Sequence, residues 1–492
     1  MSGTCRRPRA WPQASELNLV ATDEAVIGLY RKEDKIYARA VGGWFARWRW
    51  TLVCFTQLLF YGLPWLPWNG RQAVLFDLGV RRFYIFDLVL YPQDFIYLTG
   101  LLVVAAYALF LFTAVAGRLW CGYACPQTVY TEIFMWVERH TEGDRVQRIK
   151  LDAGPWSVKK LLRKGGKHAI WLAIGLWTGF TFVGYFTPIH ELWAAAFTAS
   201  FGPWESFWTL FYGFATYGNA GWMREQVCKY MCPYARFQGA MFDKDTLIIG
   251  YDAARGEPRG KRRAQGRKTD LEAANLGHCI DCGLCVQVCP TGLDIRKGLQ
   301  YECIGCAACI DVCNGVMDKM QYPRGLVRYE TENGMHHHVP GVQRFKRVLR
   351  PRVLVYSTVL CLIVGGLGTG LALRSPFRVD VERDRGSLAR IVDDGWVENV
   401  YRMQVMNATE SLQRYRIAVA GLPGSVLEAP GDVTVQAAQT RWVPLSVRVP
   451  GQQADTAGAG AHRIDFVVER MATDADTPAR TVREKSTFLV PR

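Results

Sequence analysis

Residues 279–290 read "CIDCGLCVQVCP", and residues 303–314 read "CIGCAACIDVCN". Each stretch places its cysteines as Cys-x2-Cys-x2-Cys-x3-Cys, the spacing by which bacterial ferredoxins bind [4Fe–4S] clusters. In two-cluster ferredoxins the first three cysteines of each copy bind one cluster, and the fourth binds the other. We therefore predict a two-cluster ferredoxin domain of α+β type at residues 276–320. Its first cluster is expected on Cys279, Cys282, Cys285 and Cys313, and its second on Cys303, Cys306, Cys309 and Cys289.

Other uses of these cysteines fit the spacing less well. A zinc ribbon also uses paired Cys-x2-Cys, but it needs neither a third cysteine at that spacing nor a second complete copy. Disulfides are disfavoured in a reducing cytoplasm. The second copy ends in Asn314, where the motif usually has proline. Because proline is not a ligand, this departure affects the stiffness of the loop and not cluster assembly.

A second motif is also repeated: "CGYACP" at residues 121–126 and "CKYMCP" at residues 228–233. Each copy follows an apolar stretch, and its proline suits the first position of a helix. The amphipathic stretches Gln127–Arg139 and Tyr234–Phe242 are the expected helices. A cysteine at a helix N-terminus is expected to have a lowered thiol pKa.

Together the two hexapeptides supply four candidate redox or metal-binding residues, Cys121, Cys125, Cys228 and Cys232. Four thiolates are a soft ligand set that suits Cu(I) or zinc. The arrangement is typical of an internal duplication that would bring both motifs together. The alternative is that these cysteines only pack at helix entries. Cys5, Cys54 and Cys361 have no partner at a useful spacing, and we expect Cys54 and Cys361 to be packing residues.

The composition indicates a membrane protein of several domains. The chain has 492 residues, of which 50% are hydrophobic and 17 are Trp. Five apolar runs approach the length that a bilayer requires. They are 50–68, 95–116, 169–187, 192–222 and 353–373. The fourth run is interrupted by Gly202-Pro203, so it is either one kinked helix or a re-entrant piece followed by a span. The first 43 residues are polar and basic, without a cleavable signal peptide.

The distribution of charge predicts the orientation in the membrane. The net charge is +15, but residues 374–492 carry 16 Lys and Arg against 15 Asp and Glu. The excess lies in segments that flank apolar runs, which argues against nucleic acid and follows the positive-inside rule. Residues 222–351 carry 20 Lys and Arg, whereas residues 69–93 carry 3. The ferredoxin domain is therefore expected in the cytoplasm and residues 375–492 outside it.

The remaining segments complete the predicted organisation. After residue 374, alternating apolar residues separated by Gly, Pro and Asn predict an immunoglobulin-like β-sandwich, with docking as its default role. "HHH" at His336–His338 is either a metal ligand or part of a polar loop. The predicted segments are 1–43, cytoplasmic; 44–250, a four-span membrane domain; 251–275, a basic linker; 276–320, the ferredoxin domain; 321–351, a cytoplasmic connector; 352–374, the last span; and 375–492, the extracytoplasmic domain.

Taken together, these features resemble the FixG/RdxA/CcoG family of accessory proteins of cbb-type cytochrome oxidase. The resemblance extends from about Tyr37 to the C-terminus and includes "YDAARGEPRG" at residues 251–260. It implies a multi-pass bacterial inner-membrane protein with two [4Fe–4S] clusters and a periplasmic immunoglobulin-like domain. It further implies a cupric reductase that makes Cu(I) for oxidase maturation at Cys121, Cys125, Cys228 and Cys232. The implied partners are the oxidase subunits or copper-handling assembly factors, with an unknown electron donor; a homodimer is also compatible.

Two other classes of function stay open at this point. A quinol-to-ferredoxin electron conduit of the kind found in nitrate-reducing systems also combines spans, Cys-x3-Cys-Pro pairs and ferredoxin motifs. Such a conduit would not need the long β-rich tail. A non-enzymatic scaffold would use the clusters for stability and the tail to recruit oxidase subunits. Redox titration with and without copper discriminates among the three.

Overall fold

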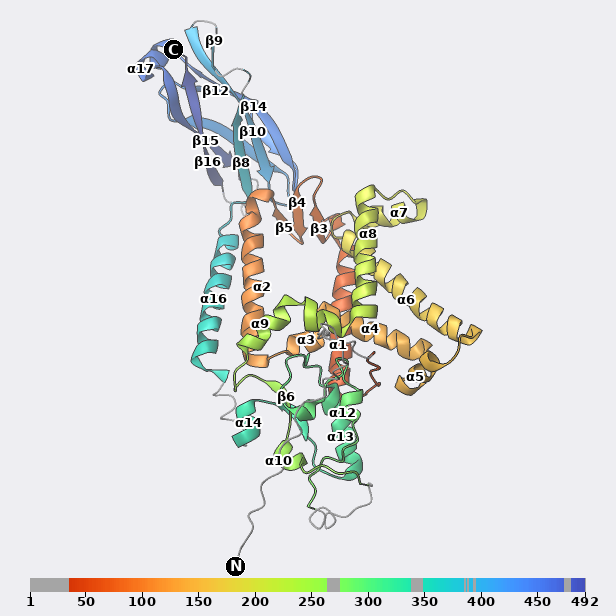
Figure 1. The fold of residues 1–492 in the computed structure, drawn as a ribbon. Helices are drawn as coiled ribbons and strands as arrows, with labels where there is room; N and C mark the ends of the chain where they lie inside the picture. Colours follow the sequence, from red (N-terminus) through yellow and green to blue (C-terminus); the bar gives the residue numbers. More distant parts are fainter. Residues whose placement is uncertain are drawn as a thin grey trace, which may run out of the picture. The chain divides into compact units, whose positions relative to one another are not determined.

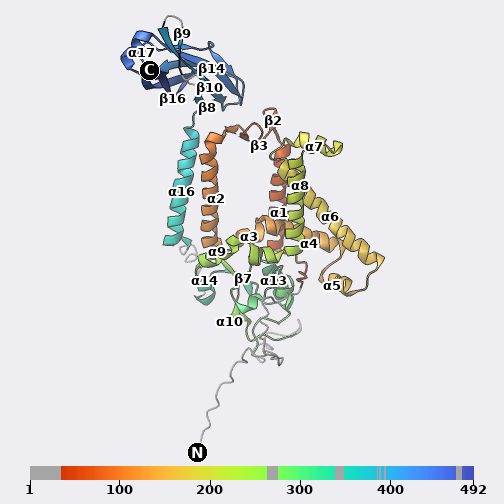
Figure 2. The ribbon, with the colours of Figure 1, turned by 45° about the horizontal axis from the view of Figure 1, so that its top comes forward.

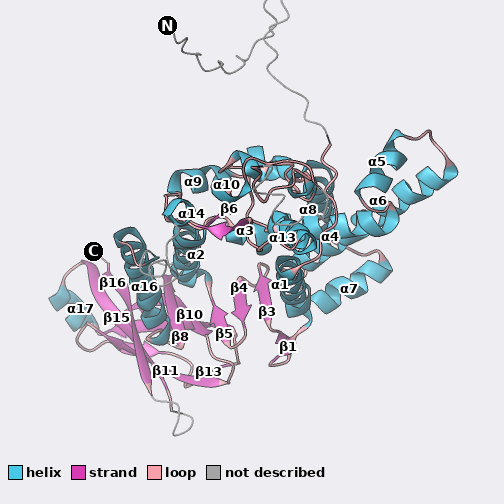
Figure 3. Cartoon of the chain, turned by 90° about the horizontal axis from the view of Figure 1, so that it is seen from below, coloured by secondary structure: helices cyan, strands magenta, loops and turns pink. Residues whose placement is uncertain are grey.

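The computed structural model describes residues 35–262, 275–337, 348–472 (without 385, 387, 388, 393 and 394) and 479–491. Tyr37–Arg492 forms one compact unit. Within this unit, long helices and a small mixed domain precede a β-rich C-terminal domain (Figure 1; Figure 3, strands in magenta).

Each predicted apolar run contains a helix, and two of the five predicted spans are supported as candidate spans. In the described part of the chain, two helical segments are long and apolar enough to cross a membrane, Pro92–Ala116 and Pro351–Ala372. Helix α1 (Trp44–Gly62) opens with the Trp- and Arg-rich sequence "WFARWRW". Helix α6 (Val158–Val183) opens with the basic "VKKLLRKGGK". Helix α8 (Pro203–Thr216) has only 14 residues.

The two candidate spans, α2 (Phe95–Ala116) and α16 (Pro351–Ala372), lie side by side (Figure 1; Figure 2). Tyr97 Oη donates to the carbonyl oxygen of Gly370 at 3.0 Å. Of the most apolar window in each segment, 0% is buried in the first and 6% in the second. Apolar surface of this extent needs a covering, and lipid is the covering that a helix of this length suits.

The fourth predicted run is divided into two helices. Helix α7 (Ile189–Thr198) ends at Ala199, whose φ of 50° is left-handed, and α8 begins at Pro203. Helix α8 packs closely on α6 through small residues. A Cβ on Gly179 would lie 2.1 Å from the carbonyl oxygen of Thr209, and one on Gly175 would lie 2.6 Å from that of Gly213. Small residues four positions apart allow this close approach between backbones.

Both hexapeptides lie at helix starts, as predicted. The first spans α3 (Leu119–Tyr123) and the start of α4 (Pro126–Thr141), which leads to α5 (Arg145–Ala153). The second follows the π-helical segment η3 (Tyr217–Met223), begins within a second one, η4 (Val227–Met231), and enters α9 (Pro233–Met241). Pro126 and Pro233 each occupy the first helical position, where a missing N–H has no cost.

The ferredoxin motifs lie in a small α+β unit. It contains α12 (Leu284–Gln287), the 3-10 turn η5 (Ile295–Lys297), α13 (Ala308–Met320) and α14 (Glu332–His337). Strands β6 (Ile248–Tyr251) and β7 (Val327–Glu330) pair antiparallel, with Ile249 opposite Tyr329. The start of the predicted linker therefore belongs to this unit, because α10 (Ala253–Gly256) follows β6 directly. Residues 263–274, His338 and the side chains of His336 and His337 lie outside the described residues.

A small sheet that the sequence did not predict connects α1 to α2. Strands β3 (Val74–Asp77), β4 (Arg82–Ile85) and β5 (Leu88–Leu90) pair in this order, beside a short ladder of β1 (Pro67–Trp68) and β2 (Arg71–Gln72). At its end, the buried carboxylate of Asp94 forms ion pairs with Arg374 at 2.5 Å and with Arg378. This links the start of α2 to the residues that follow α16.

The C-terminal domain is a sandwich of two antiparallel sheets, which confirms the β-rich prediction. One has the order β12-β14-β10-β8, with β9 also pairing β10, and the other has the order β13-β11-β15-β16. The buried side chains of Tyr401, Tyr415 and Phe466 fill the space between them. The strands are β8 (Phe377–Arg383), β9 (Arg390–Val392), β10 (Trp396–Asn407), β11 (Gln413–Ala420), β12 (Val426–Glu428), β13 (Val433–Val435), β14 (Thr440–Val449), β15 (Gly460–Arg470) and β16 (Arg480–Val490).

Candidate electron-transfer site

The two cysteine-rich loops have the same backbone conformation. In the first copy Asp281 and Gly283 have φ of 50° and 64°, and in the second copy Gly305 and Ala307 have φ of 70° and 59°. These are the equivalent positions of the two motifs. Left-handed residues alternating with right-handed ones turn successive backbone N–H groups toward one point, which makes a concavity suited to anionic sulfur.

The first predicted ligand set lines one cavity. Cys279, Cys282, Cys285 and Cys313 all face it, and its other walls include Leu284, Val316, Met317 and Leu326. Burial raises the pKa of the Cys285 thiol to about 11 and that of Cys313 to about 12. Four thiols that line an apolar cavity have few polar groups to bind. As thiolates they would need a positive charge beside them, and iron would supply it. The residues present therefore fit a [4Fe–4S] cluster.

The second predicted set is grouped in the same way. Cys289 interacts electrostatically with Cys303, Cys306 and Cys309. Burial raises the pKa of Cys303 to about 12 and raises that of Cys309 well above its usual range. In the part of the chain that the structure describes, no three His, Cys, Asp or Glu side chains converge on a single point suited to one metal ion. Cysteines spread around a cube of four irons need no such convergence.

The hexapeptide cysteines lie beside this second set. Cys121 and Cys228 pack against a buried group that contains Cys306, Val288 and Ile304. Cys228 interacts electrostatically with Cys125, Cys121 and Cys232, so the structure brings all four hexapeptide thiols into one region.

The thiols in this region differ from the prediction in their protonation. Burial raises the pKa of Cys121 to about 11 and that of Cys228 to about 12. The pKa of Cys125 is raised as well, again by burial. For Cys121, Cys125 and Cys228 the predicted lowering of the pKa is therefore wrong, because removal from water opposes the thiolate more strongly than a helix end favours it.

The first hexapeptide contacts the second ferredoxin loop backbone to backbone. A Cβ on Gly122 would lie 2.7 Å from the Gly305 carbonyl oxygen and 2.8 Å from the Cys306 nitrogen. Glycine is therefore needed for this approach. From the other side, the guanidinium of Arg49, which is only 4% exposed, donates to the Cys306 carbonyl at 2.6 Å.

Two polar residues at this junction were not found from the sequence. Gln238, on α9, is fully buried, and its amide nitrogen lies 3.3 Å from Cys121 Sγ. Tyr329, on β7, donates to the Gly305 carbonyl at 2.5 Å and lies 3.5 Å from the hydroxyl of Tyr123, the central tyrosine of "CGYACP". In the sequence, the one feature that pointed to either residue was the position of Gln238, five residues after "CKYMCP".

Two of the other cysteines lie apart from the site. Cys54, on α1, and Cys361, on α16, are exposed on the protein surface, which does not support their prediction as packing residues. Cys5 lies outside the described residues.

Three parts of the chain match known protein families. Residues 223–332 match a family described as "4Fe-4S dicluster domain", and residues 98–142 match one described as "4Fe-4S binding domain". Residues 367–491 match "IG-like fold at C-terminal of FixG". The fold and the site thus define an iron–sulfur electron-transfer protein with helices suited to a membrane and an immunoglobulin-like C-terminal domain.

The chain belongs to the family of FixG, RdxA and RdxB. It is 39% identical over 438 residues to "Nitrogen fixation protein FixG" of Rhizobium meliloti, covering 82% of this chain and 83% of that protein. It is 37% identical over 445 residues to "Protein RdxA" of Cereibacter sphaeroides, covering 88% and 92%. A crystal structure of a FixG-related protein from Vibrio parahaemolyticus is 24% identical, with a TM-score of 0.20, and covers 24% of this chain and 97% of that one.

Proposed function

We propose that this protein reduces Cu(II) to Cu(I) at the hexapeptide cysteines, for the assembly of a cbb-type cytochrome oxidase. The observation that carries the proposal is the packing of Cys121 and Cys228 against the loop of Cys306. An electron arriving at the second ligand set would then have only this packed group to cross to reach the hexapeptide thiols. When bound, [4Fe–4S] clusters supply one-electron transfer over a range that includes low potentials.

The chain's own residues would bind copper and favour its reduced state. Cu(I) is softer than Cu(II), so thiolate ligands prefer the product of the reaction. The thiols must release their protons when they bind the metal, because burial holds them protonated. The amide N–H of Gln238 would then donate to the Cys121 thiolate and orient it.

We place the protein in the bacterial inner membrane on the basis of α2 and α16. The first hexapeptide follows the end of α2 and packs on the second ferredoxin loop, so these elements share one side, which the basic residues favour as cytoplasmic. The C-terminal domain then lies in the periplasm, where it would dock oxidase subunits or copper-handling assembly factors. The electron donor is not identified by its chemistry.

A variant that lacks all four hexapeptide cysteines tests the proposal. Full-length protein would be purified anaerobically, reduced and mixed with Cu(II), and Cu(I) would be captured by a chromogenic chelator. The variant should retain its iron but form little Cu(I). Unchanged Cu(I) formation would contradict the proposal, and quinol oxidation that fails in the same variant would favour an electron conduit instead.

A further inference from the structure

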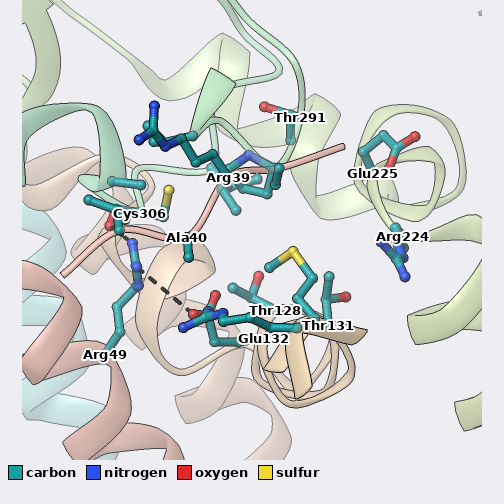
Figure 4. Close-up of a pocket in the computed structure, with 18 of the residues that line it drawn as sticks. Arg39, Ala40, Arg49, Thr128, Thr131, Glu132, Arg224, Glu225, Thr291 and Cys306 are labelled. Carbon is teal, nitrogen blue, oxygen red and sulfur yellow. Dashed lines mark hydrogen bonds and ion pairs between the residues drawn. The ribbon is translucent and has the colours of Figure 1, made fainter. Parts of the chain in front are cut away.

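A cavity of about 60 Å³ lies where the second hexapeptide meets the ferredoxin unit. Both Cys228 and Cys306 line it. Figure 4 shows Arg39 and Cys306 on one side and Arg224 and Glu225 on the other. The cavity therefore joins a proposed copper thiol to a proposed cluster ligand, and nothing described so far assigns an occupant to it.

The charges that line the cavity are mostly positive. Its walls contain five arginines, Arg39, Arg49, Arg139, Arg148 and Arg224, and three carboxylates, Glu132, Asp144 and Glu225. Arg148 and Arg224 each pair with Glu138 at 2.5 Å, and Arg49 faces Glu132 at 4.0 Å. Three of the five arginines are thus engaged by the protein itself.

The other two arginines are available to a ligand. Within the described residues, neither Arg39 nor Arg139 has a side-chain hydrogen bond or ion pair. The neutral polar side chains nearby already have hydrogen-bond partners in the protein. Thr128 Oγ1 donates to the Cys121 carbonyl at 2.5 Å, and the Gln127 amide donates to the carbonyls of Asn219 and Arg224. Guanidinium groups are therefore the spare donors of this cavity.

Guanidinium recognises carboxylate by paired hydrogen bonds and repels a free metal cation. We propose that the cavity admits copper as an anionic carboxylate chelate, with the carboxylates on Arg39 and Arg139 and the metal facing Cys228. The inference rests on the proposed copper reduction and specifies the form in which the substrate arrives.

Reduction in this cavity would exchange the ligands of copper and add one electron to it. Copper–oxygen bonds to the chelator break, and a copper–sulfur bond to Cys228 forms as the thiol proton leaves to solvent. Cu(II) would take up one electron and become Cu(I), and the chemistry that an iron–sulfur cluster would supply, when bound by its cysteines, is that electron. The released carboxylates leave as the free chelator.

The test compares an anionic with a cationic copper complex in the double variant Arg39→Gln/Arg139→Gln. Reduced full-length protein would be given Cu(II)–citrate or Cu(II)–ethylenediamine. The variant should raise the KM for the citrate complex about tenfold at unchanged maximal rate, because two ion pairs are lost. The KM for the ethylenediamine complex should stay the same. Arg236→Gln is the matched control, since Arg236 is exposed on α9 and does not line the cavity.

Equilibrium dialysis with Zn(II)–citrate, which cannot be reduced, separates this inference from the proposed function. Binding to the oxidised protein should weaken by a similar factor in the double variant. If the native protein reduces neither copper complex, the proposed function fails, yet the zinc arm still reports on the cavity. Unchanged Zn(II)–citrate binding in the variant, equal effects on both copper complexes, or citrate alone binding as tightly as its metal complex would each overturn the inference.

Discussion

Single residues decide the chemistry of the hexapeptide site. Gln238 is fully buried and reaches Cys121, although it belongs to the helix that follows the other hexapeptide. It therefore joins the two halves of the site through one hydrogen bond. Substituting a residue that orients a metal ligand typically lowers metal affinity about 10- to 100-fold.

We expect Gln238→Leu to weaken Cu(I) binding by a factor in that range while iron content stays the same. Gln238→Glu should weaken it further, because a carboxylate would face the thiolate of Cys121. A competition titration with a Cu(I) chelator measures both effects. Gln226→Leu serves as the control because Gln226 is exposed. Equal affinities in all three variants would assign Gln238 to packing alone.

The raised thiol pKa values predict how copper binding depends on pH. Cys121 and Cys228 have pKa values of about 11 and about 12, so both remain protonated well above neutral pH. Each must lose its proton to bind, and apparent affinity should rise about tenfold per pH unit for each proton released. The rise should continue from pH 7 to beyond pH 9 in Cu(I) titrations. A plateau below pH 9 would indicate thiols of ordinary pKa.

At the scale of elements, the proposed electron transfer to the hexapeptides depends on α3 lying directly on the second ferredoxin loop. A Cβ at Gly122 would meet backbone atoms of Gly305 and Cys306, and backbone cannot rotate away as a side chain can. Any side chain at this position must therefore separate the two elements. Gly315, on α13, has open space around it and gives a matched control for the same substitution.

Gly122→Ala should slow electron delivery to Cu(II) and leave both clusters in place. The expected readouts are iron content and electron paramagnetic resonance spectra close to those of the native protein, with Cu(I) formation slowed at least several-fold. Gly315→Ala should behave as the native protein does. A Gly122→Ala protein with an unchanged rate would mean that the electron does not cross at this contact.

The sequence predicted single elements better than the junctions between them. Cysteine spacing, helix-starting prolines and strand alternation are local patterns, and they predicted the ferredoxin loops, α4, α9 and the β-sandwich. The contact of Gly122 with Gly305 and the reach of Gln238 to Cys121 depend on tertiary packing between distant segments. Burial also reversed the predicted pKa shift of the thiols. Hydropathy predicted five spans, whereas two helices in the described part of the chain are long and apolar enough. The difference arises partly because α1 and α6 mix apolar with basic residues.

The whole molecule is organised around two helices that suit a membrane. If α2 and α16 both cross it, the hexapeptides and the ferredoxin unit lie on one side and the C-terminal domain on the other. A reporter fused after Arg492 should then be active only in the periplasm, and one fused to a chain truncated after Asp243 only in the cytoplasm. Activity of both reporters on the same side would contradict this topology. The amount of each fusion protein, measured by immunoblotting, controls for expression.

The ion pairs of Asp94 give the C-terminal domain a mechanical connection to the hexapeptide thiols. Asp94 directly precedes α2 and is held by Arg374 and Arg378, which follow α16. Helix α2 has 22 residues, so it is a stiff rod of roughly 33 Å, and "CGYACP" begins five residues after its end. A force applied at the C-terminal domain would therefore be transmitted along one rod to Cys121.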